Sequence, residues 1–169
     1  RARVELSGGT LSLTGTVPSE LRRDAVRTAA RHTGAVVVDR IKVPDVQRQL
    51  SELPGLTFAS GGDSLTSDSR TSLVLVARIL KANPSVRVRV EGHTDSTGSA
   101  ESNLALSRAR ARTVQDFLVG HGVTADRLSA EGYGETRLKV PDVTAGDRAQ
   151  NRRVALLATV TSPPVDDGT

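Results

Sequence analysis

A strand, a glycine-bounded loop and a long helix in immediate succession constrain this chain more than any other feature. Valines alternate with arginines over residues 86–90, which predicts a strand with one buried face. A loop bounded by Gly92 and Gly98 follows and carries an acid, Asp95, at its tip. A helix is then predicted from about Ala100 to Val119. This succession favours a small α/β fold in which the loop lies at the end of a sheet.

Arg110 is predicted to point inward from that helix. At about 100° per residue, Arg110 falls near the middle of an apolar arc, whereas Arg108 and Arg112 point to the opposite side. The arc consists of Leu106, Ala109, Arg110, Thr113, Val114, Phe117 and Leu118. A charge on the core side needs a paired partner, because unpaired burial is costly. Either Arg110 is a structural ion-pair partner that reaches past the core edge, or Arg110 and Asp95 flank a site for a ligand that carries both charges.

The composition limits the size and chemistry of the core. The chain has 169 residues, with 37% apolar and 2% aromatic residues, so one or two small domains with an aliphatic core are expected. The absence of Cys excludes disulfides and thiol chemistry. The sequence begins with Arg1 rather than Met, so we expect it to be a piece of a longer protein. No stretch approaches the roughly 18 apolar residues that a membrane helix needs.

The formal net charge of +4 is spread along the chain. Such an excess of positive charge suits binding to nucleic acid, to anionic lipid or to an anionic wall polymer. Single-stranded nucleic acid is disfavoured, because almost no aromatic side chains are present to stack on bases. No nucleic-acid partner and no cofactor are therefore predicted.

Residues 1–44 are predicted to form a ββαβ unit. A two-glycine turn at 7–10 separates two strands over 4–6 and 11–17, which is typical of a hairpin. A helix is expected from Pro18-Ser19-Glu20 to about His32, ended by Gly34, and a third strand over 35–43. The residues that mark one face of this helix are Leu21, Ala25, Thr28, Ala29 and His32.

The rest of the chain divides into a linker, a second domain and a tail. Residues 45–55 are predicted to link the units, with a short helix before Pro54-Gly55. The second domain is expected over 56–160, and a disordered tail over 161–169. Within the domain we expect strands at 56–59, 86–90, 127–133 and 154–160, helices at 66–82 and 100–119, and a short turn or helix after Asp147.

The first unit resembles a BON domain, in particular its second half. The resemblance rests on the runs Gly9-Thr10-Leu11-Ser12-Leu13-Thr14-Gly15-Thr16-Val17-Pro18 and Val36-Val37-Val38-Asp39-Arg40-Ile41-Lys42-Val43. It implies contact with phospholipid or with envelope proteins. Arg23, Arg27 and Arg31 line up on the predicted helix and could form a basic face, although ordinary solvated charge explains them as well.

The second domain resembles the OmpA-like peptidoglycan-binding domain over about 100 residues. The motifs that carry this resemblance are Val88 to Gly98, Asn103 to Ala111, Gly122-Val123, Arg127-Leu128, Gly132-Tyr133-Gly134-Glu135 and Arg148 to Val154. The resemblance implies a βαβαβ domain in two layers with a mixed sheet, and a place in the cell envelope, on its periplasmic side or at the wall, associated with the outer membrane.

The same resemblance implies a ligand and a set of residues that bind it. In this family the acid of the Gly-His-Thr-Asp loop and the arginine of the Leu-Ser-x-x-Arg-Ala helix clamp diaminopimelate of the wall peptide; here these residues are Asp95 and Arg110. Asp95 would bind the ammonium group and Arg110 a carboxylate, ideally with both prongs of its guanidinium. The resemblance adds further residues to the binding set, namely Thr94, Asn103, Asn151 and Arg152. Strand alternation lets only one of Arg152 and Arg153 face the site.

Other functions remain open at this level. Asp95 can be a simple turn former, and His93 is expected to fix the loop by hydrogen bonding rather than to bind a metal. Catalysis is disfavoured, because no Ser-His-Asp arrangement with supporting motifs is present. A non-catalytic wall anchor is the leading hypothesis. Alternatives are a lipid- or protein-binding role of the BON-like segment and an anchor associated with a stator or pore.

Overall fold

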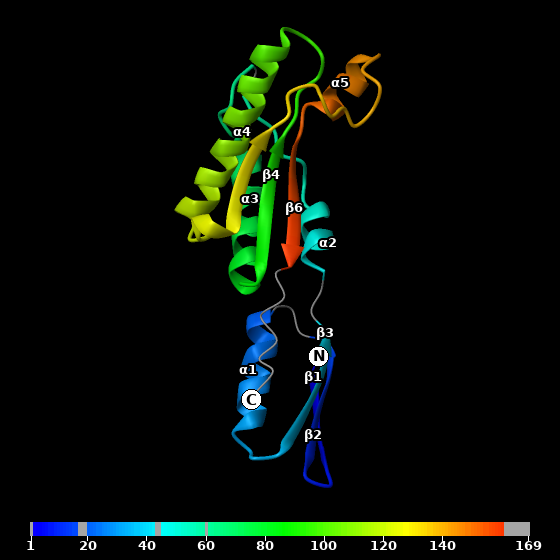
Figure 1. The fold of residues 1–169 in the computed structure, drawn as a ribbon, viewed down its shortest axis with the longest axis vertical. Coiled ribbons are helices and arrows are strands. Elements are labelled where there is room, and N and C mark those ends of the chain that lie inside the picture. Colours follow the sequence, from blue (N-terminus) through cyan, green and yellow to red (C-terminus); the bar gives the residue numbers. More distant parts are fainter. Residues whose placement is uncertain (1, 17–19, 43–44, 60, 161–169) are drawn as a thin grey trace, which may run out of the picture.

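The computed structural model of the chain describes residues 2–16, 20–42, 45–59 and 61–160. These residues form two α/β units with one three-stranded sheet each (Figure 1). The element order is ββαβ in the first unit and, apart from a 3-10 turn, ααβαβαβ in the second. The tail expected to be disordered and the Pro18-Ser19 start of the first helix lie outside the described residues.

The hairpin predicted in the first unit is confirmed. β1 (Ala2–Ser7) pairs antiparallel with β2 (Thr10–Thr16). Gly8 and Gly9 form the turn with φ values of +54° and +77°. Both values are positive, as the tightest hairpin turns require, and only glycine adopts them without strain.

A helix and a third strand complete the first unit, also as predicted. α1 (Glu20–Arg31) leads to β3 (Val36–Lys42), which pairs parallel with β2, so the strand order is β1-β2-β3. The face predicted for the helix is wrong. Val26 and Ala30 pack on the sheet, whereas Ala25, Thr28 and Ala29 are exposed. The inward side also carries the half-buried Arg23 and Arg27, whose aliphatic stems can lie on apolar surface.

The segment predicted as a linker packs on the second unit. α2 (Val46–Ser51) inserts Val46 and Leu50 into the core of that unit. Its Gln47 side chain accepts a hydrogen bond from the backbone N–H of Ala158 (2.7 Å) and donates one to the carbonyl of Leu156 (3.2 Å). Gln47 therefore satisfies backbone groups at the edge of the second sheet, which would otherwise be free to pair with another chain.

The strand predicted over 56–59 does not form, so the second unit does not begin with a strand. Phe58 makes only an isolated bridge with Leu65. The reason is local, because the backbone N–H of Thr57 donates to the Ser69 hydroxyl (2.7 Å) and that of Ala59 to the carbonyl of Ser64 (2.8 Å). These groups are satisfied by the helix α3 (Ser67–Ala82) and by a tight turn instead of by a neighbouring strand.

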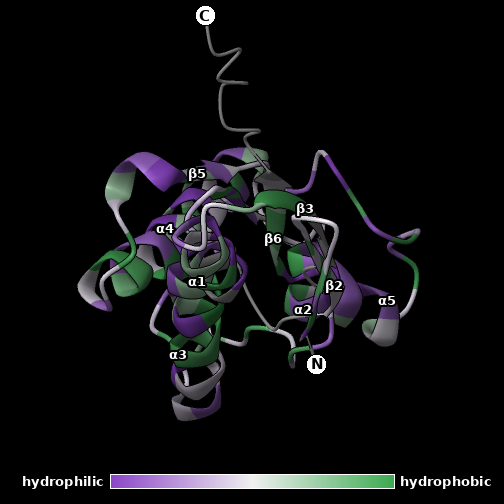
Figure 2. Cartoon of the chain, turned by 90° about the horizontal axis from the view of Figure 1, so that it is seen from below, coloured by the Kyte–Doolittle hydropathy of each residue, from purple (hydrophilic) through white to green (hydrophobic). Residues whose placement is uncertain are grey.

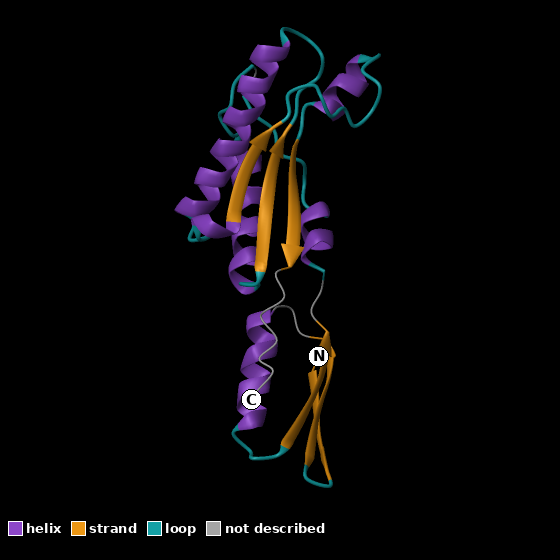
Figure 3. Ribbon diagram, viewed as in Figure 1, coloured by secondary structure: helices purple, strands orange, loops and turns teal. Residues whose placement is uncertain are grey.

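The second sheet is mixed, as predicted. Its strands are β4 (Val86–Gly92), β5 (Leu128–Gly132) and β6 (Val154–Val160), in the order β5-β4-β6. β4 runs parallel to β5 and antiparallel to β6. α3 (Ser67–Ala82) and α4 (Ala100–Gly120) lie together on one face of this sheet (Figure 3). A short 3-10 turn, η1 (Ala125–Arg127), precedes β5, and α5 (Ala145–Asn151) precedes β6.

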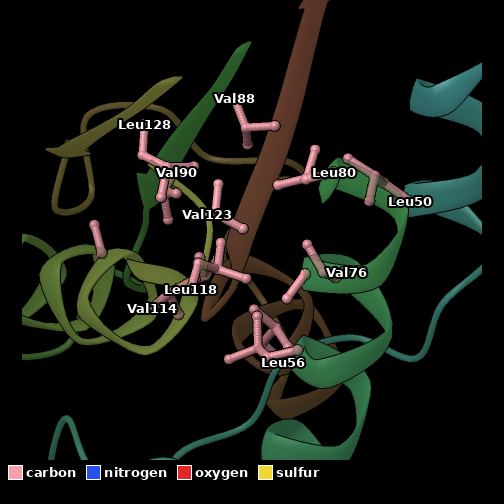
Figure 4. Close-up of a cluster of buried hydrophobic side chains, with 14 of the residues drawn as sticks. Leu50, Leu56, Val76, Leu80, Val88, Val90, Val114, Leu118, Val123 and Leu128 are labelled. Atoms are coloured by element: carbon pink, nitrogen blue, oxygen red, sulfur yellow. The ribbon is translucent and has the colours of Figure 1, made fainter. Parts of the chain in front are cut away.

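The core of the second unit lies between this sheet and its two helices. The valines of β4 point to the helices and its arginines to solvent, as the alternation predicted. Hydrophobic and hydrophilic stretches are interleaved along α3 (Figure 2), and Leu73, Val76 and Leu80 form its buried stripe. Figure 4 shows Leu80 and Val76 from α3 beside Leu50 from the predicted linker.

Glycines let α4 approach the sheet closely. A Cβ atom at Gly92 would lie 2.1 Å from the Ser107 carbonyl oxygen, and one at Gly132 would lie 2.3 Å from the Arg108 nitrogen. Such distances leave no room for a side chain. The loop after β4 and the middle of α4 are therefore held in contact, and this contact positions the candidate site.

Candidate functional site

Asp95 lies in the loop that leaves β4 and is almost completely buried. Its side chain is held at both oxygens. Oδ1 accepts a hydrogen bond from the Thr97 backbone N–H (2.9 Å), and Oδ2 accepts one from the Arg152 guanidinium (2.6 Å). Burial alone would raise the pKa of Asp95, but the hydrogen bonds from Arg152 and Thr97 outweigh it and lower the pKa. Asp95 is therefore an anion at neutral pH.

Arg110 points inward from α4 and is 8% exposed. Its Nε donates to the carbonyl of Gly62 (2.9 Å), and its guanidinium carbon lies 5.0 Å from the centre of the Phe58 ring. Burial lowers the pKa of Arg110, and the positive charge of Arg152 lowers it further. The negative charges of Asp63 and Asp95 raise it. An arginine stays charged under such influences, so a buried cation faces the same region as the Asp95 anion.

The inward direction of Arg110 was predicted, but its place on the helix was not. Arg110 lies at the border of the buried face of α4, which comprises Asn103, Ser107, Arg110, Ala111, Val114 and Leu118. Leu106 and Phe117, counted in the predicted arc, are only half-buried. The arc was misplaced because a small residue, Ser107, faces the close contact with the sheet, where a large apolar side chain would not fit.

Arg110 and Arg152 line one open pocket of about 240 Å³. Its other walls come from Leu56, Thr57, Phe58 and Ala149. Among the described residues no carboxylate lies within ion-pair distance of Arg110, whereas Asp95 is paired with Arg152. The sequence predicted that Asp95 and Arg110 would flank the site. The structure brings them into one region together with Arg152, a second cation that already contacts the acid.

The other residues of the predicted set hold the loops in place. Asn103 is buried, and its side-chain N–H group donates to the carbonyls of Asp95 and Thr97 (both 3.2 Å). Asn151 is fully buried; it accepts hydrogen bonds from the backbone of Lys139 and Val140 and donates one to the carbonyl of Val140. These two amides brace the loops on either side of the pocket without lining it.

Thr94 is also buried, at 3% exposure. Its backbone N–H donates to the carbonyl of Gly134 (2.9 Å), and its hydroxyl has no hydrogen-bond partner among the described residues. Thr94 thus adds to the predicted set a buried hydroxyl that has no hydrogen-bond partner in the described part of the chain.

Sequence reasoning missed three contributors to this region. Asp142 accepts hydrogen bonds from the backbone N–H of Ser96 (2.7 Å) and from its hydroxyl, which ties the loop after β5 to the loop of Asp95. Phe58 and Gly62 position Arg110. The strand expected at 56–59 drew attention away from Phe58, and nothing local marks a carbonyl such as that of Gly62 as a partner.

His93 was expected to fix the loop by hydrogen bonding, and this is not observed. Neither ring nitrogen has a hydrogen-bond partner among the described residues. The ring stacks on Tyr133 at 5.5 Å between centres, and its Nε2 lies 3.6 Å from the Glu91 carboxylate. Burial and then Arg153 lower the pKa of His93 more than Glu91 raises it. A neutral His93 therefore holds the loop by packing.

Only one of Arg152 and Arg153 reaches the acid, as predicted, but strand alternation is not the reason, because both residues precede β6 and Arg152 caps α5. Arg152 reaches Asp95, whereas Arg153 donates to the carbonyls of Asn151 and Arg137.

No cluster of His, Asp and Glu side chains suited to a metal ion occurs among the described residues. In the same part of the chain, none of the helices has both the length and the apolar character that crossing a membrane would take.

The second unit thus combines a mixed sheet, two helices on one face of it, and a buried acid and a buried arginine beside the loop that leaves β4. Residues 57–152 match the OmpA family. This match covers more than half of the chain, so the chain belongs to the OmpA family.

Curated relatives extend the similarity. The "Peptidoglycan-binding protein ArfA" of Mycobacterium tuberculosis is 36% identical over 166 residues, which cover 88% of this chain and 51% of that protein. The "Peptidoglycan-associated lipoprotein" of Pseudomonas putida is 41% identical over 102 residues, or 59% of each chain. The chain thus spans about half the length of the ArfA proteins that it matches.

Solved structures share the fold. The C-terminal domain of Helicobacter pylori MotB matches with a TM-score of 0.59 and 28% identity, covering 64% of this chain and 86% of that one. The peptidoglycan-associated lipoprotein from Burkholderia pseudomallei matches with the same TM-score and identity, covering 62% and 89%. The mixed fold expected from the sequence is therefore confirmed, and it is the fold of these domains.

Proposed function

We propose that the second unit binds peptidoglycan non-covalently and anchors the protein that carries it to the cell wall. Relatives named for peptidoglycan binding or association support this proposal. The location that goes with it is the cell envelope, since other relatives are an outer-membrane lipoprotein and an outer membrane porin of Pseudomonas aeruginosa. The proposed activity is binding, and no catalytic step is part of it.

The proposed ligand group is the free end of diaminopimelate in the stem peptide of the wall. This end carries an ammonium and a carboxylate on one carbon. Asp95 would accept hydrogen bonds from the ammonium group, and Arg110 would bind the carboxylate through a charge-assisted pair of hydrogen bonds. The apolar wall of Leu56 and Phe58 suits the methylene chain that joins this end to the rest of the stem.

The observation that carries the proposal is the environment of Arg110. Its guanidinium is buried, yet its hydrogen-bond partner is a carbonyl oxygen and its neighbour is an aromatic ring, with no ion-paired acid among the described residues. A buried charge without a counter-ion is unfavourable. A carboxylate from a ligand that enters the open pocket would neutralise it.

Sedimentation with purified wall sacculi tests the proposal. Asp95→Ala and Arg110→Ala should each abolish most of the binding, and Arg110→Lys should restore little, because an ammonium lacks the two-pronged donor geometry. Arg108→Ala is the matched control, since Arg108 is exposed on the same helix. Undiminished binding by both alanine variants would refute the clamp.

The ligand group can be tested separately by NMR titration of the chain with free diaminopimelate and with Nα-acetyl-lysine methylamide. The amino-acid end of the second compound is blocked, so it offers a side-chain ammonium group without a carboxylate and should cause no comparable shifts. Shifts of the Thr97 amide, which donates to Asp95, are expected with diaminopimelate in the wild type and not in Asp95→Ala. Equal responses in these two proteins would exclude Asp95 as the contact.

For residues 1–44 we propose a BON-like module that interacts with phospholipid or envelope proteins. The similarity to ArfA covers 88% of the chain and so extends beyond residues 57–152, which favours a shared role for the first unit. Asp24 lies within 4 Å of both Arg23 and Arg27 and offsets part of the basic face. Flotation of the chain with anionic and with neutral liposomes is the test; binding to neither type would leave only the protein-contact form of this proposal.

A further inference from the structure

β1 lies at the edge of the first sheet and exposes apolar side chains. The strand order is β1-β2-β3, so β1 has one strand neighbour in the described part of the chain. Val4 is 54% exposed and Leu6 is 68% exposed. An edge strand with exposed apolar residues and free backbone groups is a ready template for pairing with another chain.

Val4 and Leu6 are exposed because α1 does not cover β1. In the hairpin register Val4 lies opposite Leu13 and Leu6 opposite Leu11, so all four side chains share one face of the sheet. α1 buries Leu11 and Leu13 through Val26 and Ala30, but leaves the two side chains of β1 uncovered. The apolar face of this sheet therefore continues past the helix to the open edge.

The charges on β1 lie between these apolar residues. Arg3 and Glu5 are 77% and 62% exposed and form an ion pair of 3.4 Å along the strand. Because they flank Val4 symmetrically, the segment Arg3-Val4-Glu5 presents one positive and one negative side chain on either side of an apolar centre.

From this symmetry we infer that β1 pairs antiparallel with β1 of a second copy of the chain, centred on Val4. In this register Val4 faces Val4 of the second copy, and Arg3 faces Glu5 twice. Opposite charges in directly opposed positions stabilise an antiparallel pair. The two sheets would join into one sheet of six strands, with the same surface used by both copies, as a two-fold dimer requires.

The neighbouring registers are less favourable. A pairing centred on Arg3 puts Arg3 opposite Arg3, and one centred on Glu5 puts Glu5 opposite Glu5, so like charges oppose each other. A shift by one residue places Val4 opposite Arg3 or Glu5 and brings an apolar side chain against a charged one. Only the register centred on Val4 matches both the charges and the apolar residues.

Charge reversal tests this dimer by sedimentation equilibrium of the whole 169-residue chain. Arg3→Glu alone creates two Glu-Glu contacts per dimer, and Glu5→Arg alone creates two Arg-Arg contacts. Each single change should weaken the dimer roughly tenfold or more, and the double change Arg3→Glu with Glu5→Arg should restore it, because opposite charges face each other again. Arg78→Glu, on the exposed side of α3, changes the net charge equally and should have no effect.

The positions are exposed, so folding is expected to be retained in all variants, as far-UV circular dichroism will verify. A wild-type chain that stays monomeric up to hundreds of micromolar would overturn the inference, because this edge would then serve another occupant or none. A dimer that ignores the single reversals, or that the double change fails to restore, would also overturn it and would point to a different surface.

Discussion

The two units of this chain bury very different amounts of apolar surface. The core of the second unit contains seventeen buried apolar residues, whereas that of the first contains Leu11, Leu13 and Ala30 among the described residues. The second unit also buries charged groups, such as Asp95 and Arg110. The first unit leaves Val4 and Leu6 in solvent instead. A large core can hold a buried, charged site in place, while a small sheet with one helix leaves surface that another molecule can cover.

The sharpest way to break the second unit is to add one methyl group at Gly92. Gly92→Ala would place a Cβ atom 2.1 Å from the Ser107 carbonyl oxygen. The backbones of β4 and α4 would have to separate, so we expect a loss of more than about 4 kcal/mol in the free energy of unfolding. Urea denaturation will measure it. Gly120→Ala is the control, because a Cβ atom there meets no atom within 4 Å; equal stability of both variants would contradict the close packing.

A matched pair of core substitutions compares the units directly. Leu80 and Leu13 are both fully buried. Leu80→Ala should cost about 3 kcal/mol and weaken binding to sacculi, because it opens a cavity beneath the sheet that carries the site. Leu13→Ala should disrupt the first unit and leave binding to sacculi intact. Thermal denaturation and sedimentation with sacculi will check both; loss of binding in Leu13→Ala would show that the units depend on each other.

The tie between the two loops of the site is expected to contribute less. Asp142→Ala removes the acceptor of both hydrogen bonds from Ser96. We expect a small loss in the free energy of unfolding and faster hydrogen exchange of the Ser96 amide. Ser96→Ala removes only the hydroxyl, so its effect should be smaller. Unchanged exchange in Asp142→Ala would mean that the other contacts of the Asp95 loop, among them those of Asn103 and Arg152, hold it without Asp142.

A change in pH is expected to have the smallest effect on the stability of the fold. The pKa of His93 is lowered from its ordinary value of 6.5, mainly by burial. Below 6.5 the unfolded chain therefore binds a proton that the folded chain does not, and stability falls as the pH drops from 6.5 through the folded pKa. The carboxyls of Asp95 and Asp142, whose pKa values are lowered from 3.8, act in a separate, more acidic window. In His93→Gln the loss that begins near pH 6.5 should disappear; an identical pH profile would exclude His93.

Much of the fold could be predicted because local patterns are strong here. The alternating valines of β4, the apolar spacing of α3 and the double glycine of the first hairpin each specify one local structure. The strand at 56–59 was wrong because a side chain distant in sequence, Ser69, binds its backbone. The buried face of α4 was misplaced because the contact with Gly92 and Gly132 selects small residues, which hydrophobic patterns overlook.

The residues of the candidate site also divide into those that the sequence predicted and those that it did not. Sequence motifs pointed to Asp95, Arg110 and Arg152, and their role in ligand binding stays a prediction. Asp142, Phe58 and Gly62 could not be found from the sequence, since their contacts join positions 46 to 52 residues apart. Asn103 and Asn151 belonged to the predicted binding set, but their amides bind backbone groups of the loops and, for Asn103, also the Glu135 carboxylate.

By itself the sequence determined most of the helices and strands, the family, and the presence of an acid and an inward arginine fifteen residues apart. Such features depend on the spacing of residue types along one strand or helix. The tertiary structure alone decided that Arg152 takes the Asp95 carboxylate and that Arg110 is left with a carbonyl and an aromatic ring. The reason is that the pairing of buried charges depends on distances between separate elements, and those distances are fixed only when the sheet and its helices pack.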